Sequence, residues 1–216
     1  MIVLARYTTR GQYPAYAERL RASCQRFGLA HDIAKVDDGG NWSNVCNDRP
    51  NWILQALCNA RQSILCVDAD CEFQKFPSLL VGQGCDFAAY NWSADPLNAG
   101  ANGPNRHTYN PERLLVSGGV MLFGYTAAAM EFLVRWISKI GEAPGTTVTD
   151  PLIDFAYNTY RPPLSTLWLP RSYNFLSPLW GKGEDAVILH HYFAGALREN
   201  PELCATRAAE MAVQNA

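Results

Sequence analysis

Strand-like and helix-like segments alternate through the first third of this 216-residue chain. Short apolar runs indicate strands, and apolar residues repeated at three- and four-residue spacing indicate helices. The expected strands are 2–5, 31–36 and 63–67, and the expected helices between them are 13–27 and 51–61. Strands that alternate with helices usually pair in parallel, with the helices packed on the faces of the sheet. The pattern therefore predicts an α/β fold with a mostly parallel central sheet flanked by helices.

Proline and glycine mark the expected helix ends. Pro14 suits the first turn of the first helix, and Gly28 suits its end. Pro50 is expected to open the second helix, which puts Arg49 just before the helix N-terminus. A cation at that position is unfavourable against the helix dipole. A functional reason for Arg49 is therefore favoured.

The second half of the chain is less regular. Further strands are expected at 85–90, 114–123, 167–169 and 186–190, and further helices at 126–140 and 150–157. Ser117-Gly118-Gly119 is expected to interrupt the strand at 114–123, as a bulge or a place of close backbone approach. The stretch 91–110 is rich in Asn, Gly and Pro, and a loop of that length usually serves as a lid or a binding surface. No linker or repeat divides the chain, so one Rossmann-type domain over residues 1–216 is expected.

Charge and cysteine usage argue against several function classes. With 18 Lys+Arg against 20 Asp+Glu, the net charge of −2 cannot attract nucleic acid or an anionic membrane. The seven cysteines include no CxxC pair, which argues against a zinc ribbon, a thioredoxin-like site or a disulfide framework. No stretch approaches the ~20 apolar residues of a transmembrane helix, and the N-terminal apolar run is too short for a signal peptide. A cytoplasmic protein without a nucleic-acid partner or transmembrane segment is therefore expected.

Two aspartates, Asp68 and Asp70, follow directly on the most strand-like segment, Ile64–Val67. Open α/β sheets bind their ligands where the strands end. Alternate residues of a strand point to the same side, so both carboxylates could meet at one cation. Oxygen ligands favour Mg²⁺ or Mn²⁺, which commonly bridge to phosphates. Such an acidic pair can also serve as a turn or a helix cap, so the interpretation needs context.

That context comes from Arg49-Pro50 before the acidic motif and from the pair His190 and His191 late in the chain. Together they resemble the nucleotide-sugar glycosyltransferases of the GT-A fold, most closely the family-8-like group of galactosyltransferases, glucosyltransferases and glycogenin. The resemblance implies that Asp68 and Asp70 bind Mn²⁺ or Mg²⁺ and, through it, the diphosphate of a UDP-sugar. It also implies that one histidine is the third metal ligand, and His191 is preferred because its spacing to the following glycine is nearer the family pattern.

The resemblance, which runs from Ile2 to about Arg198, implies further site residues. Those expected at the nucleotide and donor sugar are Ala5, Tyr7 and Thr8 after the first strand, Arg49, and Ser117, Gly118 and Gly119. Asp150 would lie beside the reacting sugar, although Pro151 replaces the amide that usually follows. Arg198, in place of the family's lysine, would neutralise the leaving diphosphate. Independently of the resemblance, core or loop packing is the expected role of each aromatic residue, and Trp92 and Trp180, in loops near the expected cleft, are the candidates to test for stacking on a sugar.

The resemblance thus implies a hexosyltransferase that moves a sugar from a UDP-sugar to an acceptor hydroxyl with retention at the anomeric carbon. A glycan, a lipid-linked sugar and a protein all remain possible acceptors. One alternative is an inactive nucleotide-sugar or glycan-binding domain of the same fold. A second is a sugar nucleotidyltransferase, although such enzymes have a glycine-rich loop after the first strand and residues 5–12 contain one glycine. The absence of a Walker loop and of GxGxxG disfavours kinases and dehydrogenases.

Overall fold

The computed structural model describes residues 1–39, 42–95, 115–142, 150–160, 163–180 and 182–191. Within these residues lies a six-stranded sheet of order β2-β1-β3-β6-β5-β7. Its strands are β1 (Ile2–Tyr7), β2 (His31–Lys35), β3 (Ile64–Val67), β5 (Phe87–Asn91), β6 (Val116–Phe123) and β7 (Thr166–Trp168). A small sheet of order β4-β9-β8 contains β4 (Cys71–Phe73), β8 (Phe175–Leu176) and β9 (Ile188–His190).

Strand direction gives the main sheet one functional edge. β1 pairs in parallel with both β2 and β3, and β5 pairs in parallel with β7, whereas β6 runs antiparallel to β3 and β5. The carboxyl ends of β1, β2, β3, β5 and β7 therefore lie at the same edge as the beginning of β6. We call this the carboxyl edge. The predicted α/β class with a mostly parallel sheet is confirmed.

Alternating apolar residues divide the core between the two faces of the sheet. On β1, Val3 packs in one core and Leu4 in the other, and on β3 the same holds for Leu65 and Ile64. Successive side chains of a strand point to opposite faces, so strands covered on both sides are apolar throughout. All four residues of β3 and all eight of β6 are buried.

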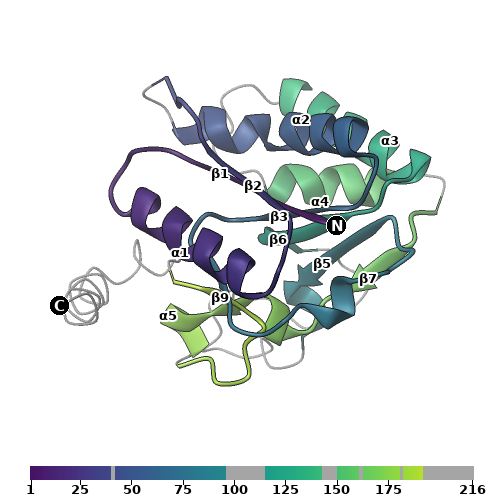
Figure 1. Ribbon diagram of the computed structural model, residues 1–216. Coiled ribbons are helices and arrows are strands. Elements are labelled where there is room, and N and C mark those ends of the chain that lie inside the picture. The colour runs from purple at the N-terminus through teal and green to yellow at the C-terminus, as the bar shows by residue number, and fades with distance from the viewer. Residues whose placement is uncertain (40–41, 96–114, 143–149, 161–162, 181, 192–216) are drawn as a thin grey trace.

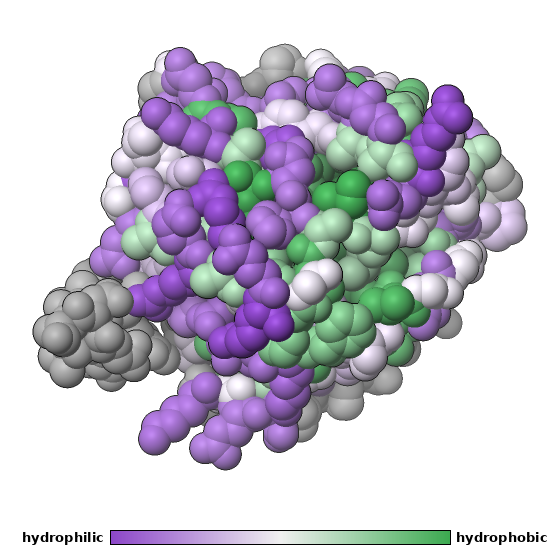
Figure 2. All heavy atoms as spheres, in the orientation of Figure 1, coloured by the Kyte–Doolittle hydropathy of each residue, from purple (hydrophilic) through white to green (hydrophobic). Residues whose placement is uncertain are grey.

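Helices cover both faces of this sheet (Figure 1). The first helix, α1 (Tyr13–Arg26), packs on one face, where Ala17 and Leu20 are completely buried. The opposite face is covered by α2 (Trp42–Ala60), α3 (Ala127–Glu142) and α4 (Asp150–Thr159). A short helix, α5 (Ser177–Trp180), follows β8. On the side shown in Figure 2, hydrophilic residues dominate over α1, whereas apolar residues reach the surface mainly toward β7.

The expectation that Pro50 opens a helix is wrong. α2 begins at Trp42, so Pro50 lies inside it and Arg49 lies near its middle rather than before its N-terminus. Proline inside a helix removes one backbone hydrogen bond and is normally unfavourable. Here Val45 on one side of the proline and Ile53 on the other are both buried, so both parts of α2 are anchored in the protein. Tertiary packing therefore outweighs the local preference of proline.

β6 is continuous from Val116 to Phe123, so Ser117-Gly118-Gly119 does not break the strand. The bulge considered for these residues agrees with a shift in the register against β5, where Ala89 pairs with Met121 but Asn91 pairs with Val116. The Gly119 carbonyl accepts a hydrogen bond of 2.9 Å from the Asp68 N–H, which keeps this part of the strand paired. Of the loop expected at 91–110, Asn91 belongs to β5 and Trp92–Ala94 form a short 3-10 helix. The rest of that loop, from residue 96, lies outside the described residues.

The other predicted elements are present within a few residues of their expected bounds. Sequence reasoning did not predict β4 and β8, which have three and two residues and carry no periodic signal of their own. Among the described residues, no helix is both long and apolar enough to cross a bilayer.

Candidate functional site

The chain turns sharply where the acidic motif lies. β3 ends at Val67, and β4 begins at Cys71 after a turn in which the Cys71 N–H donates to the Asp68 carbonyl over 3.0 Å. Because Asp68 and Asp70 lie in a turn, the alternation of a strand does not apply to them. The two carboxylates consequently have different neighbours.

Asp68 pairs with Arg49. The guanidinium of Arg49 contacts the Asp68 carboxylate, Nη2 to Oδ1, at 2.6 Å and donates through Nη1 to the Gly118 carbonyl at 2.7 Å. Arg49 therefore reaches from the middle of α2 to the ends of β3 and β6, at the carboxyl edge. The Asp68 side chain is about one-third exposed, at 34%. The Arg49 side chain is mostly buried, at 13% exposure, and its guanidinium can donate several hydrogen bonds in a fixed geometry to an anionic ligand at this edge.

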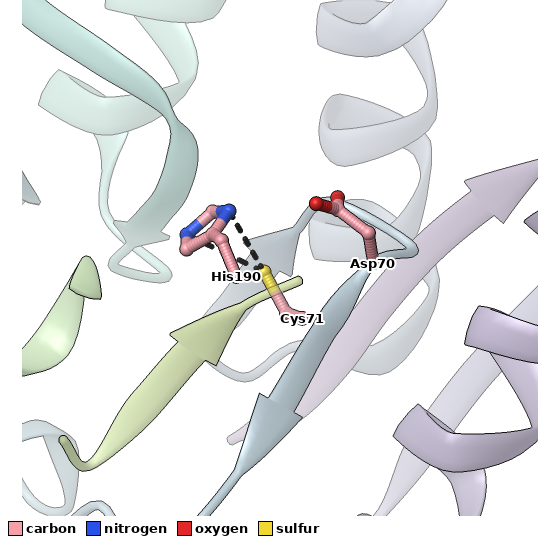
Figure 3. Close-up of side chains that lie close together, drawn as sticks. All are labelled: Asp70, Cys71 and His190. Carbon is pink, nitrogen blue, oxygen red and sulfur yellow. Dashed lines mark hydrogen bonds between the residues drawn. The ribbon is translucent and has the colours of Figure 1, made fainter. Parts of the chain in front are cut away.

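Asp70 lies with Cys71 and His190 in what we call the buried donor group. One ligand atom from each residue lies within 4.8 Å of the other two, and the side chains approach one another from β4 and β9 (Figure 3). Cys71 and His190 are direct partners in the β4–β9 ladder. Cys71 Sγ lies 3.5 Å from both ring nitrogens of His190. The exposed fractions are 5% for Asp70, 0% for Cys71 and 3% for His190.

Burial controls the protonation of this group. Desolvation lowers the pKa of His190 to about 4, so the imidazole is neutral near pH 7. Desolvation also raises the pKa of the Cys71 thiol well above its ordinary value of 9.0. Neutral imidazole is the form of histidine that binds metal ions, and carboxylate and thiolate are the corresponding forms of the other two side chains. Burial thus keeps His190 in its metal-binding form but Cys71 as a thiol, which would lose its proton on binding a cation.

Gly119 makes room for the imidazole. A Cβ atom at this position would overlap Cε1 of His190, so a side chain larger than hydrogen would displace the ring. A close approach was among the expectations for Gly119, and the group that approaches it is the ring of His190. Next to it, Ser117 Oγ donates to Asn174 Oδ1 over 3.1 Å, and both residues are buried. Contact of Ser117, Gly118 and Gly119 with a donor sugar stays a prediction.

The structure places His190, and not the preferred candidate His191, in the buried donor group. His191 Nε2 lies 2.7 Å from Glu72 Oε2, and its ring stacks on Tyr16 of α1 with 6.1 Å between centroids. The hydrogen bond from His191 lowers the pKa of Glu72. Neighbouring residues at a strand end point in different directions, which separates the two histidines. Asp68 is likewise outside the group, and its contact with a metal ion stays a prediction.

The residues expected around the nucleotide lie in or near the end of β1. Ala5 is buried in the core, while Tyr7 and Thr8 are at the carboxyl edge. Tyr7 Oη accepts a hydrogen bond of 3.3 Å from Arg21, and Thr8 is buried. The two residues expected to act in catalysis are not placed: Asp150 begins α4 but its side chain lies outside the description, as does all of Arg198.

A second feature of the carboxyl edge was missed from sequence. A cleft of about 300 Å³, which we call the β5–β7 cleft, opens beside the ends of these strands. It is lined by Tyr90, Asn91, Ala94, Asp95, Trp168, Leu169, Pro170 and Arg171. Asp95 accepts hydrogen bonds from Tyr90 Oη at 2.6 Å and from Arg171 Nε at 2.9 Å. Residues 90–95 and 168–171 are far apart in sequence and meet because β5 pairs with β7. Only a prediction of that strand pairing could have indicated this cleft.

The aromatic candidates have different environments from those expected. Trp92 is only 7% exposed and packs against Tyr90 and Trp180, with ring centroids 5.0 and 5.7 Å away. The Trp180 ring is also covered by the guanidinium of Arg171, 4.4 Å from its centroid. Trp168 in the β5–β7 cleft is 37% exposed. Of these three tryptophans, Trp168 is therefore the most exposed.

Comparison with known proteins finds likeness in structure alone. No family model and no curated protein sequence matches the chain. A glycosyltransferase involved in the glycosylation of the major capsid of PBCV-1 superposes with a TM-score of 0.65 at 14% identity, covering 92% of this chain and 96% of that one. The glycosyltransferase GlyE of Streptococcus pneumoniae TIGR4 superposes with a TM-score of 0.55 at 12% identity, and its apo form with 0.56 at 13%. Both GlyE matches cover 89% of this chain but 54% of GlyE. The chain therefore has the fold of these glycosyltransferases.

Proposed function

We propose that this protein is a metal-dependent glycosyltransferase that moves a hexose from a UDP-sugar to an acceptor hydroxyl. The observation that carries the proposal is the position of the buried donor group. It lies at the end of β3, next to the Arg49–Asp68 pair, in a chain with the fold of glycosyltransferases. A cation site beside an arginine at the carboxyl edge is suited to a diphosphate.

Each side chain has a defined part in the proposed reaction. Asp70 and His190 hold the cation, and Arg49 donates hydrogen bonds to the diphosphate. A divalent cation bound there would stabilise the negative charge that develops on the diphosphate as the sugar departs. Contact of the donor sugar with Gly118 is proposed from the family resemblance, whereas the space at Gly119 is taken by the His190 ring. Arg198, and Asp150 beside the sugar, are proposed from the family resemblance, as is retention at the anomeric carbon.

The β5–β7 cleft is proposed as the place where the acceptor binds. It lies across β6 from the buried donor group, at the same edge of the sheet. Sugar-binding sites combine an accessible aromatic face with polar groups that reach hydroxyls, and Trp168 with Asp95 and Arg171 supplies both. The acceptor itself remains a glycan, a lipid-linked sugar or a protein.

The proposal is tested by UDP release from UDP-glucose and UDP-galactose with divalent ions added to chelator-treated protein. We expect metal-dependent release that falls about 10²-fold in Asp70→Asn and in Arg49→Gln, since each removes one electrostatic contact in the site. Glu142→Gln, on the exposed end of α3, is the matched carboxylate control and should release UDP at the wild-type rate. Equal rates in wild type, D70N and R49Q would contradict the proposal.

The same assay separates the alternatives. Metal-dependent binding of UDP without release from any UDP-sugar would indicate an inactive binding domain. Release of pyrophosphate from UTP and a sugar 1-phosphate would indicate a nucleotidyltransferase. The variants His190→Gln and His191→Gln distinguish the two histidines. Only His190→Gln should abolish metal-dependent UDP release, because only His190 lies in the buried donor group.

A further inference from the structure

The buried donor group contains a thiol, which distinguishes it from the oxygen-rich site expected from two aspartates. We propose that Cys71 Sγ binds the metal ion together with Asp70 and His190, and that the site therefore takes Zn²⁺ or Co²⁺ in preference to Mg²⁺ or Mn²⁺. This deepens the proposed function, on which it rests for the use of a divalent ion, by naming the class of ion.

The spacing of the sulfur and nitrogen atoms carries the first step. A tetrahedral ion bound at about 2.3 Å from sulfur and about 2.0 Å from nitrogen holds these two atoms about 3.5 Å apart. Cys71 Sγ lies 3.5 Å from Nδ1 and 3.5 Å from Nε2 of His190. The sulfur is equally far from the two nitrogens and so faces neither lone pair, and a rotation of the imidazole ring would aim one nitrogen at an ion shared with the sulfur. A carboxylate oxygen of Asp70 lies within 4.8 Å of both partners.

The backbone holds these atoms in place. Cys71 and His190 are opposite each other in the β4–β9 ladder, so strand pairing fixes the distance between their Cα atoms. The His190 ring packs against Gly119, where there is no space for a Cβ atom, and this prevents the ring from retreating toward β6. Strand pairing therefore leaves only side-chain rotation to complete the site, which limits the conformational entropy lost when the ion binds.

The chemistry of the three donors selects the ion. Thiolate and imidazole are soft or borderline ligands that favour Zn²⁺ and Co²⁺, whereas Mg²⁺ and Mn²⁺ favour oxygen. Three protein ligands also leave a coordination position for an oxygen of the substrate, as in catalytic zinc sites. The Cys71 thiol donates a weak hydrogen bond to the Gly119 carbonyl, 3.7 Å from Sγ. Binding forms the metal–sulfur bond and releases the thiol proton to solvent.

The chain provides matched thiols as controls. Cys24 is as completely buried as Cys71 but lies on the core-facing side of α1, and Cys58 is exposed on α2. Neither belongs to a group of metal-ligating side chains among the described residues. Substitutions at these positions change the number of thiols without changing the buried donor group.

The test is titration of the metal-free full chain with Co²⁺, followed by near-ultraviolet and visible absorption. We expect a thiolate-to-cobalt charge-transfer band that Zn²⁺ removes stoichiometrically and a large excess of Mg²⁺ does not. The band should persist in Cys24→Ala and Cys58→Ser. It should be lost in Cys71→Ser and in His190→Gln, with Co²⁺ affinity reduced at least about tenfold. A band retained in C71S, or absent from wild type, would overturn the proposal.

A measurement on unaltered protein covers the case in which the variants do not fold. The NMR shift of bound cadmium distinguishes sulfur from oxygen and nitrogen ligands, and we expect a shift typical of one sulfur ligand. A shift typical of oxygen and nitrogen alone would overturn the proposal. This outcome is independent of the proposed function. A cobalt–thiolate band without UDP release would contradict only the proposed transferase activity. UDP release with Mg²⁺ but without the band would contradict only the proposal that Cys71 is a ligand.

Discussion

The carboxyl edge carries two polar regions of opposite character, one on each side of β6. In the buried donor group every side chain is at most 5% exposed, and its polar atoms face one another. In the β5–β7 cleft, Trp168 is 37% exposed and the Asp95–Arg171 pair lines an open volume of about 300 Å³. The first region brings together three ligand atoms for an ion, and the second has room for part of a larger molecule.

This difference has an energetic consequence. Buried polar groups lose their hydration, so any change in charge or size there acts at nearly full strength. Groups at an open cleft keep part of their hydration, and their interactions are weakened by water. The two regions should therefore respond differently to pH and to substitution, and the following predictions test that difference in order of expected effect.

The largest effect should come from acidification of the metal-free protein. The pKa of His190 is about 4 in the folded protein against 6.5 for the free side chain, so between these pH values the unfolded chain binds the extra proton. The free energy of unfolding should therefore fall as the pH decreases from 6.5 to 4, by up to about 3 kcal/mol. Urea unfolding at several pH values measures the slope. In His190→Gln the slope should be clearly shallower, and an unchanged slope would show that this histidine does not titrate as its burial requires.

Substitution of Gly119 should have the next largest effect. In Gly119→Ala the new methyl group overlaps the His190 ring, and the overpacking should lower the free energy of unfolding by about 2 kcal/mol. The Co²⁺ titration should show weaker binding as well. Gly141→Ala is the control: it lies in α3 with no atom near its Cβ position and should raise stability by about 0.5–1 kcal/mol. Equal changes for both variants would argue against a tightly packed ring.

A smaller effect is expected for the charge pair of the cleft. Asp95→Asn removes the charge that faces Arg171 but keeps an acceptor for Tyr90 Oη. Because both partners are partly hydrated, the loss in stability should be about 1 kcal/mol. Thermal unfolding at low and high salt measures it, and the difference from wild type should shrink at high salt. A loss as large as that of Gly119→Ala would mean that the cleft is closed in solution.

An effect of similarly small size is expected for Trp168. Trp168→Ala on β7 should lower the free energy of unfolding by about 1 kcal/mol, because 37% of the residue is exposed while its ring also packs against Tyr157. The buried Trp136 of α3 is the matched contrast, and Trp136→Ala should cost about 3–5 kcal/mol. Urea unfolding of both variants gives the comparison. A large loss in Trp168→Ala would assign that ring to the core rather than to a binding surface.

Local patterns predicted the elements well and their contacts poorly. The apolar run at β3 and the helical spacing at α1 identify buried elements because burial fixes which positions must be apolar. The predicted start of α2 at Pro50 was wrong because packing of Val45 and Ile53 outweighs the preference of proline for the first turn of a helix. Gly119 was noticed as a point of close approach, but a glycine does not indicate what approaches it.

The sequence by itself determined the α/β class, the mostly parallel sheet and the position of the acidic pair after β3, since these depend on periodicity and on neighbouring residues. Only the tertiary structure decided that Asp68 faces Arg49 and that Asp70 faces His190 rather than His191. Cys71 and His190 are 119 residues apart and meet because β4 pairs with β9. The face to which each side chain points depends on that register, and a shift of one residue would exchange the two histidines.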